Sequence, residues 1–137
     1  MTTATATTNH GSVAQIFGAV VDVRFPPGKL PPIYNAISVK DEQRGIDLTL
    51  EVSQHLGNDV VRCVAMASTD GCRRGMTAID SGSAIKVPVG DACKGRIFNL
   101  LGQALDTKTR GAVNATEFWP IHRPAPDFAD QSTKVEI

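Results

Sequence analysis

The most constraining feature of this chain is a stretch in which apolar and polar residues alternate strictly. Apolar residues occupy every second position from Ile46 to Val52, and polar residues fill the positions between them. Successive side chains of a strand point to opposite faces, so a period of two predicts a strand with one buried and one solvated face. A second apolar run follows at 60–67 after a turn-rich segment. The two runs together predict a β-hairpin.

Further short strands are predicted on both sides of this hairpin, at 12–17, 19–25, 35–40 and 78–80. Gly18 interrupts the first two and predicts a bulge or a tight bend. The Asp70-Gly71 dipeptide predicts a hairpin turn before the last strand. About six short strands at regular spacing are typical of a small antiparallel barrel or sandwich. We expect a barrel, because closure leaves no exposed strand edge.

After residue 82 the pattern changes. Ser81-Gly82 is expected to break the chain, and a short strand is predicted at 84–89. A helix is predicted over 91–101, with Asp91 as its N-cap and Gly102 as its C-cap. Its apolar stripe would consist of Cys93, Ile97, Leu100 and Leu101. Beyond it only 118–121 resembles a strand, so we interpret the last third of the chain as a domain begun but not finished.

Composition argues against several classes of function. Fourteen basic and fourteen acidic residues leave no net charge to attract nucleic acid or an anionic membrane. Between residues 11 and 82 there are seven basic and eight acidic residues, with only Phe17, Phe25 and Tyr34 as aromatics. A barrel that binds single strands needs a basic groove and stacking aromatics. The apolar runs are also too short to span a bilayer.

The thiol and imidazole side chains do not suggest a metal site or a disulfide framework. The cysteines are odd in number and form no C-x-x-C pair, and the histidines lie far apart. Free thiols fit a reducing compartment. We interpret His10, His55 and His122 as loop or surface residues. Cys63, Cys72 and Cys93 are expected to be free thiols, and we interpret Cys72 as a bystander rather than a nucleophile.

Two short motifs could carry chemistry. Gly90 to Ile97, GDACKGRI, comes close to a phosphate-binding loop, but Arg96-Ile97 stands where the motif needs Lys and then Ser or Thr. Its second glycine would also fall inside the predicted helix. Arg73-Arg74 could be an anion site or an interface contact, although a solvated basic pair is the commoner explanation for such a dipeptide.

The order of several segments resembles one family closely, from about Gly11 to the end of the chain. The chain is similar to the N-terminal portion of the beta subunit of the rotary F-type ATP synthase. Cys72, Lys94 and Ala104 depart from residues usual in that family. The resembling segments are GAVVDVRF (18–25), LPPIYNAISV (30–39), LEVSQHLG (50–57), VVRCVAM (60–66), TDGCRRGM (69–76), DSGSAIKVPVG (80–90), GRIFNLLGQALD (95–106) and IHRPAPDF (121–128).

The resemblance implies a mainly β fold: a six-stranded antiparallel barrel followed by an incomplete α/β segment with one helix. It implies the barrel at 11–82 and a truncated start of a nucleotide-binding domain at 83–137, while the uncharged, Thr-rich residues at 1–10 predict a flexible arm. The family's phosphate loop, catalytic and metal-binding residues would lie beyond Ile137. We therefore expect no catalytic, cofactor-binding or metal-ligating residue here, and expect MgATP or MgADP to bind only in the full-length parent.

The implied role is subunit packing in the alternating alpha/beta hexamer of a proton-driven ATP synthase. The implied partners are alpha subunits and, for the full-length parent, the central stalk, with no nucleic acid and no direct membrane insertion. The implied location is peripheral, on the cytoplasmic or organelle-interior side of an energy-transducing membrane, which would be a bacterial cell membrane or an organelle inner membrane. The alternative is a stand-alone small β-barrel that binds nucleic acid or protein.

Overall fold

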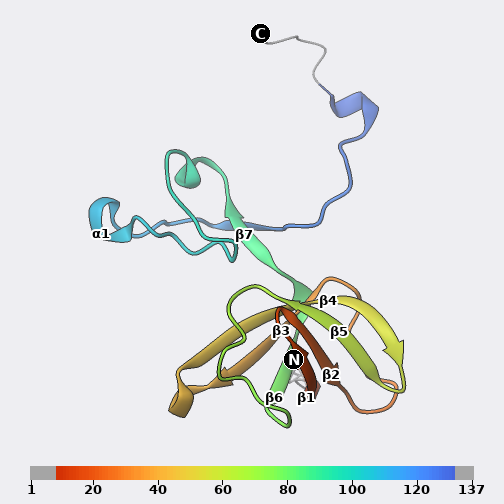
Figure 1. The fold of residues 1–137 in the computed structure, drawn as a ribbon. Coiled ribbons are helices and arrows are strands. Elements are labelled where there is room, and N and C mark those ends of the chain that lie inside the picture. Colours follow the sequence, from red (N-terminus) through yellow and green to blue (C-terminus); the bar gives the residue numbers. More distant parts are fainter. Residues whose placement is uncertain (1–8, 132–137) are drawn as a thin grey trace, which may run out of the picture.

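Six antiparallel strands wrap around one apolar interior in the computed structural model, which describes residues 9–131 (Figure 1). They form a closed barrel in the order β1-β2-β5-β4-β3-β6. Because β6 pairs with both β1 and β3, every strand has two neighbours and no edge is left open. The strands are β1 (Asn9–Phe17), β2 (Val20–Arg24), β3 (Asn35–Asp41), β4 (Ile46–Gly57), β5 (Val60–Ala65) and β6 (Thr77–Ala84).

The predicted barrel and its main hairpin are confirmed. β4 and β5 pair antiparallel, as the alternating pattern predicts. The alternation ends at Val52 because the register shifts between Val52 and Gln54, which marks a bulge. Gly18 forms the tight bend between β1 and β2, with a φ of 55° that favours glycine.

The predicted hairpin at Asp70-Gly71 is wrong. β5 and β6 do not pair, because β5 already lies between β2 and β4 while β6 lies between β1 and β3. Residues 66–76 instead form a loop at one end of the barrel (Figure 1). An Asp-Gly pair indicates only a local turn of the backbone. Which strands pair depends on the arrangement of the whole sheet.

The predicted break at Ser81-Gly82 is also wrong, because β6 continues to Ala84. The Asp80 carboxylate accepts hydrogen bonds from the Gly82 amide and from the Asn35 side chain, at 2.9 and 3.0 Å. These bonds carry the strand through a local irregularity. Asn9 and His10 belong to β1, where they pair with Asp80 and Ile79 of β6, while the rest of the predicted arm at 1–10 lies outside the described residues.

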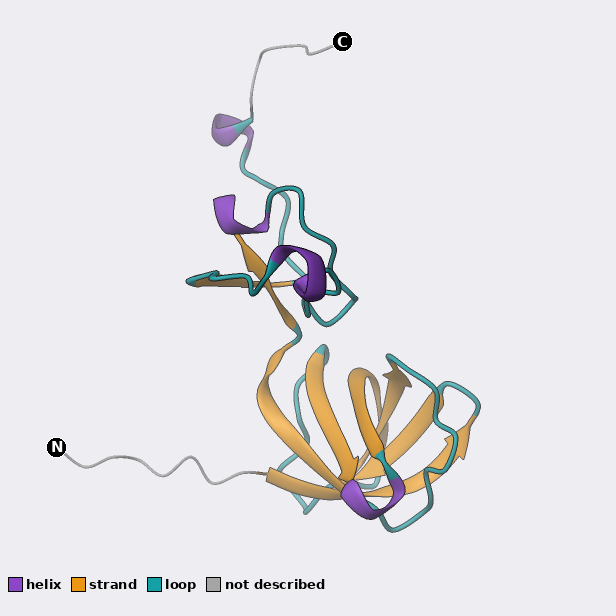
Figure 2. Cartoon of the chain, turned by 90° about the vertical axis from the view of Figure 1, so that its left-hand side faces the viewer, coloured by secondary structure: helices purple, strands orange, loops and turns teal. Residues whose placement is uncertain are grey.

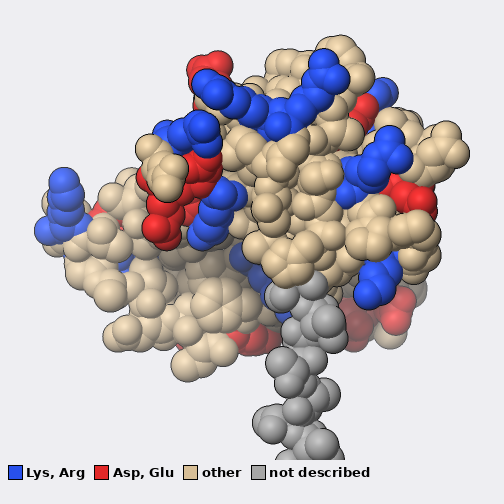
Figure 3. Space-filling view, turned by 90° about the horizontal axis from the view of Figure 1, so that it is seen from below, with Lys and Arg blue, Asp and Glu red and all other residues tan. Residues whose placement is uncertain are grey.

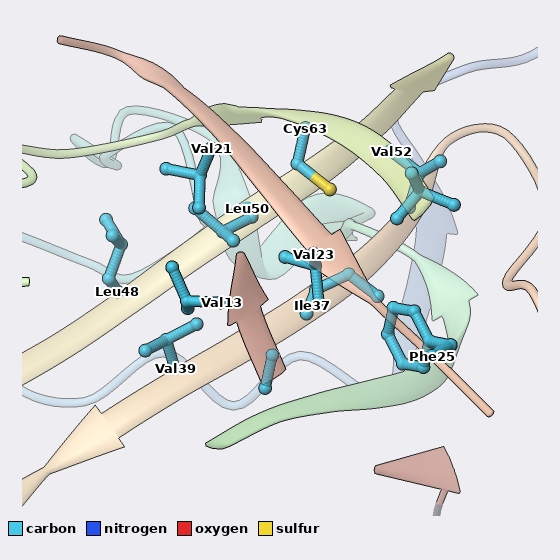
Figure 4. Packing of buried hydrophobic residues seen from close by; sticks show 12 residues of the cluster. Val13, Val21, Val23, Phe25, Ile37, Val39, Leu48, Leu50, Val52 and Cys63 are labelled. Carbon is cyan, nitrogen blue, oxygen red and sulfur yellow. The ribbon is translucent and has the colours of Figure 1, made fainter. Parts of the chain in front are cut away.

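The barrel interior is filled by the inward-facing side chains of all six strands (Figure 4). Facing pairs come from neighbouring strands, for example Val21 with Cys63 and Ile37 with Leu50. Burial of this apolar surface is the main stabilising term for such a sheet. The buried cluster consists of Val13, Val21, Val23, Phe25, Ile37, Val39, Leu48, Leu50, Val52, Val61, Cys63 and Ala78.

A smaller second segment leaves the barrel through β6, with only Ile85 separating β6 from the next strand (Figure 2). Its two strands pair antiparallel, and the second of them confirms the strand predicted at 118–121. The short helical elements contribute three or four residues each. The bounds are β7 (Lys86–Val89), η2 (Asp91–Cys93), α1 (Thr107–Arg110), β8 (Glu117–Pro120) and η3 (Phe128–Asp130), while η1 (Glu42–Arg44) belongs to the barrel.

The predicted helix over 91–101 is wrong, because only Asp91–Cys93 form a helical turn. Asp91 is not the N-cap: Gly90 holds that position and no side chain caps the turn. The Asn99 side chain accepts hydrogen bonds from the amides of Leu101 and Gln103, at 3.0 and 2.9 Å. Hydrogen bonds from backbone amides to an Asn side chain compete with the hydrogen bonds of a helix, and here they favour a loop.

Gly102 is not a helix C-cap but a point of close approach to β7. Its φ is 74°, and a Cβ placed on it would lie 2.6 Å from Pro88 Cδ and 3.0 Å from Val87 Cα. Glycine is therefore required by both conformation and space. Glycine is typical both of a helix C-cap and of a place where two backbones pack closely. The sequence alone could therefore not distinguish the two roles.

We expect the barrel interior to dominate stability. Leu50→Ala removes a fully buried side chain and should cost about 2–5 kcal/mol of unfolding free energy. Ser53→Ala, on the exposed part of the same strand, should change it by about 0.5 kcal/mol or less. Urea denaturation of both variants measures the difference. Equal losses would contradict a core in which Leu50 is a central side chain.

Candidate functional site

The segment resembling a phosphate loop, Gly90 to Ile97, is a series of turns rather than a loop leading into a helix. Gly90 has a φ of 95° and Gly95 one of 68°. The sequence argument that Gly95 lies inside a helix is therefore wrong. The argument from Arg96-Ile97 remains, because the Lys and hydroxyl of a phosphate loop are still missing.

The Arg96 guanidinium binds groups of the second segment itself. Its guanidinium donates to both carboxylate oxygens of Asp106, at 2.9 and 3.0 Å, and to the Gly111 carbonyl at 2.6 Å. Both side chains are largely buried, with exposures of 11% and 9%. The hydrogen bonds from Arg96 lower the pKa of Asp106, and the same bonds raise the pKa of Arg96. Arg96 is thus a structural group and not a ligand for phosphate.

Two of the cysteines lie where their thiols stay protonated. Burial raises the pKa of Cys63 to about 12, with a smaller contribution from Asp22. Burial, and then the charge of Asp70, raises the pKa of Cys72. The thiolate is the nucleophile and the metal ligand, so these thiols are poor candidates for either role. Cys63 is a core side chain, and Cys72 packs against the core.

The histidines make contacts that position segments of the chain. His55 Nε2 lies 2.8 Å from the Pro31 carbonyl, and His122 Nε2 lies 3.0 Å from Glu51 Oε2. The His122 ring also stacks on Tyr34, with centroids 4.0 Å apart. His10 and His55 lie in β1 and β4 and His122 lies outside the strands, and all three side chains are exposed, which confirms their interpretation as loop or surface residues.

Two kinds of feature are missing from residues 9–131. No group of three or more His, Cys, Asp and Glu side chains in this range is placed to hold a metal ion. No helix in the same range has the length and apolar character needed to cross a membrane.

A partly buried ion pair that sequence reasoning missed lies on the barrel wall. Arg62 of β5 donates to both oxygens of Asp22 of β2, at 2.8 and 2.9 Å, and Asp22 is only 5% exposed. The hydrogen bonds to Asp22 raise the pKa of Arg62. The two residues are forty positions apart, so their pairing could be inferred only from the register between β2 and β5.

The arginine pair singled out in the sequence lies on the loop at 66–76. Arg73 and Arg74 are both exposed. Neither forms an ion pair with any residue in the described range, unlike Arg44, Arg62 and Arg96. Of the two motifs singled out in the sequence, Arg73-Arg74 is the one whose charged side chains remain available to a ligand or partner.

The barrel wall carries exposed apolar side chains in one cross-strand row. Phe17 pairs with Val20, and Val20 pairs with Val64 on the next strand. Their neighbours Val21 and Cys63 point inward, so this row faces outward. Phe17 is 56% and Val64 41% exposed. This apolar row lies outside the buried cluster and is a candidate contact surface.

The second segment exposes more apolar surface than its size explains. Pro88, Phe98 and Phe118 line a small hollow on it. Only two strands and a few turns are available to cover these side chains. The exposed large side chains of this segment are Ile97, Leu100, Leu105, Phe118, Trp119, Ile121 and Phe128.

We expect the Asp106 carboxyl to titrate below its ordinary value of 3.8. Because the pKa is lowered in the folded state, the pair stabilises the fold above that ordinary value. This contribution is lost as the pH falls through the folded pKa. Carboxyl ¹³C NMR of the chain measures the midpoint. Arg96→Gln should return it towards 3.8, whereas Lys94→Gln, which removes a cation bound to Asp91, should leave it low. An unchanged midpoint in Arg96→Gln would contradict this assignment.

The barrel described above is the part of the chain that a known family matches. The family model described as "ATP synthase alpha/beta family, beta-barrel domain" covers residues 13–82, just over half of the chain. That range starts within β1 and ends within β6, so it spans all six strands of the closed barrel. The chain belongs to the ATP synthase alpha/beta family and contains its β-barrel domain.

Proposed function

We propose that this chain is the subunit-packing part of an F-type beta subunit, which alternates with alpha subunits in a hexamer. The observation that carries the proposal is the family match over the whole closed barrel. The beta-type segments along the chain, such as TDGCRRGM at 69–76, support beta rather than alpha. The role is to hold neighbouring subunits in place, while the proton-driven synthesis of ATP belongs to the full-length assembly.

The barrel's own architecture supports a packing role. A closed barrel offers no strand edge, so a neighbour must bind through side chains on the wall or at the ends. The outward row of Phe17, Val20 and Val64 supplies apolar contact area on three adjacent strands. We assign this row to the contact with the adjacent alpha-type barrel, because burying exposed apolar area is the main driving force for such an association.

Residues 83–131 fit the beginning of a nucleotide-binding domain. Their exposed apolar side chains, Phe118 and Leu105 among them, would be covered by the remainder of such a domain. MgATP or MgADP and the central stalk would then be bound by residues outside this chain. The assembly would be peripheral, on the inner side of an energy-transducing membrane.

Co-assembly with an alpha-type partner tests the proposal. The chain is mixed with the barrel-bearing portion of an alpha-type subunit, and light scattering after size exclusion measures the complex. We expect a defined complex, and we expect Phe17→Ser with Val64→Ser to weaken it about tenfold or more, since both exposed side chains lose contact area. Leu105→Ser, an equally exposed apolar residue in the second segment, is the matched control and should have little effect.

Three results would count against the proposal. The first is the absence of any complex with the alpha-type portion while the chain is folded. The second is salt-dependent retention on single-stranded DNA, which would favour the stand-alone binding module instead. The third is micromolar, magnesium-dependent binding of ATP by this chain in calorimetry.

A further inference from the structure

One end of the barrel carries a basic hollow of about 380 Å³. It lies where β3 leads into η1, beside the loop 66–76 and the start of β6. Seen from below, the molecule shows Lys and Arg side chains in several groups, with acidic side chains beside many of them (Figure 3). We call it the basic rim and define it by its charged lining: Lys40, Asp41, Arg44, Arg73 and Arg74.

The charges of the basic rim do not cancel. Four cations face one carboxylate, Asp41, and that carboxylate is already engaged by the side chain and the amide of Arg44. Those hydrogen bonds lower the pKa of Asp41, so it remains ionised and paired with Arg44. Lys40 pairs with Asp47 at 3.3 Å, but both groups are more than 60% exposed, and such a pair exchanges readily.

Arg73 and Arg74 contribute the uncompensated charge. Neither makes an ion pair with a residue in the range 9–131. Two guanidinium groups side by side in sequence offer several N–H donors, which match the oxygens of carboxylates. Placing cations together costs free energy through mutual repulsion, and an anionic partner removes that cost.

The backbone that carries the two arginines is anchored on both sides. The Gly75 amide donates to the Val13 carbonyl at 2.8 Å, and the Val13 amide donates to the Met76 carbonyl at 2.9 Å. On the other side, Thr69 Oγ1 donates to the Gly18 carbonyl at 2.7 Å. Cys72 and Met76 also pack against the core. The arginines therefore extend from a fixed loop, which lowers the entropy lost when a partner binds.

The arginine pair of the basic rim lies away from the second segment. β6 starts at the rim with Thr77 and ends at Ala84, from where the chain passes into β7 (Figure 1). Arg73 and Arg74 therefore lie away from residues 86–131, whereas Lys40 also lines a hollow that it shares with Lys86, Leu101 and Gln103. Because the barrel has no free strand edge, a partner at this end must be recognised through side chains, and the side chains here are cationic.

We propose that the basic rim docks an acidic segment of a partner protein, with the carboxylates of that segment bound by Arg73 and Arg74. Charge complementarity is the basis for choosing this occupant. A nucleic acid strand is the less suitable polyanion, because no aromatic residue lines the hollow to stack a base. This docking does not depend on whether the chain is a beta or an alpha type of subunit.

The test measures the affinity of the whole chain for a fluorescein-labelled, glutamate-rich peptide by anisotropy at low salt. We expect Arg73→Glu with Arg74→Glu to raise the Kd about tenfold or more. The matched control is Lys29→Glu with Lys108→Glu, which changes the net charge by the same amount at two exposed lysines away from the rim. The control should keep a Kd within about twofold of the unmodified chain. Thermal unfolding verifies that both variants fold.

Each of the other outcomes overturns the proposal. Equal loss of binding in the two double variants would mean that the peptide responds only to net charge. An oligonucleotide of the same charge that binds as tightly as the peptide would assign the rim to nucleic acid. Failure of the folded, unmodified chain to bind the peptide at low salt would show that the rim is only a solvated basic surface.

Discussion

The pairing of β1 with β6 is the contact on which the rest of the structure depends. It joins the first strand of the barrel to the last, across register pairs such as Gly11 with Ala78. Without it both strands would expose a row of unpaired backbone groups, and the interior would be open along one side. Val13 sits at the end of this seam, where its amide and carbonyl hold the loop 66–76 in place. The closed interior and the fixed basic rim both follow from this closure.

The two parts of the chain are stabilised in different ways. In the barrel, twelve buried apolar side chains form one cluster, and the ion pair between Asp22 and Arg62 ties β2 to β5 on the wall. In the second segment, polar contacts hold the turns together. Arg96 donates hydrogen bonds to Asp106, and the Asn99 side chain accepts from the Gln103 amide in the turn between them. Net gains from polar contacts are small compared with apolar burial. Much of the segment's apolar surface remains exposed, as expected for a part that packs against something else.

The strands of the barrel could be predicted because their information is local. A period of two at 46–52 and the glycine bend at 18 depend on a few neighbouring residues. The order of strands could not be obtained in this way, which is why Asp70-Gly71 suggested a pairing of β5 with β6 that does not exist. The helix at 91–101 failed for a related reason. Its apolar spacing fits a helix, but the side chain of Asn99 and the close approach of Gly102 to β7 favour a loop.

The candidate surfaces likewise combine residues that the sequence indicates with an arrangement that only the fold determines. Arg73 and Arg74 were visible in the sequence, but their common hollow with Lys40 and Arg44 exists only because β3 and β6 lie side by side. The pairing of Asp22 with Arg62 likewise depends on register.

Amide hydrogen exchange tests the central claim, which is that the closed barrel is the firmly folded unit and residues 86–131 depend on further contacts. The comparison uses amides that are hydrogen-bonded in both parts, those of the β4–β5 ladder against Leu105 and Ile121. We expect the ladder amides to be protected about a hundredfold more strongly, because they exchange only when the barrel opens. Equal protection in the two parts would contradict the claim.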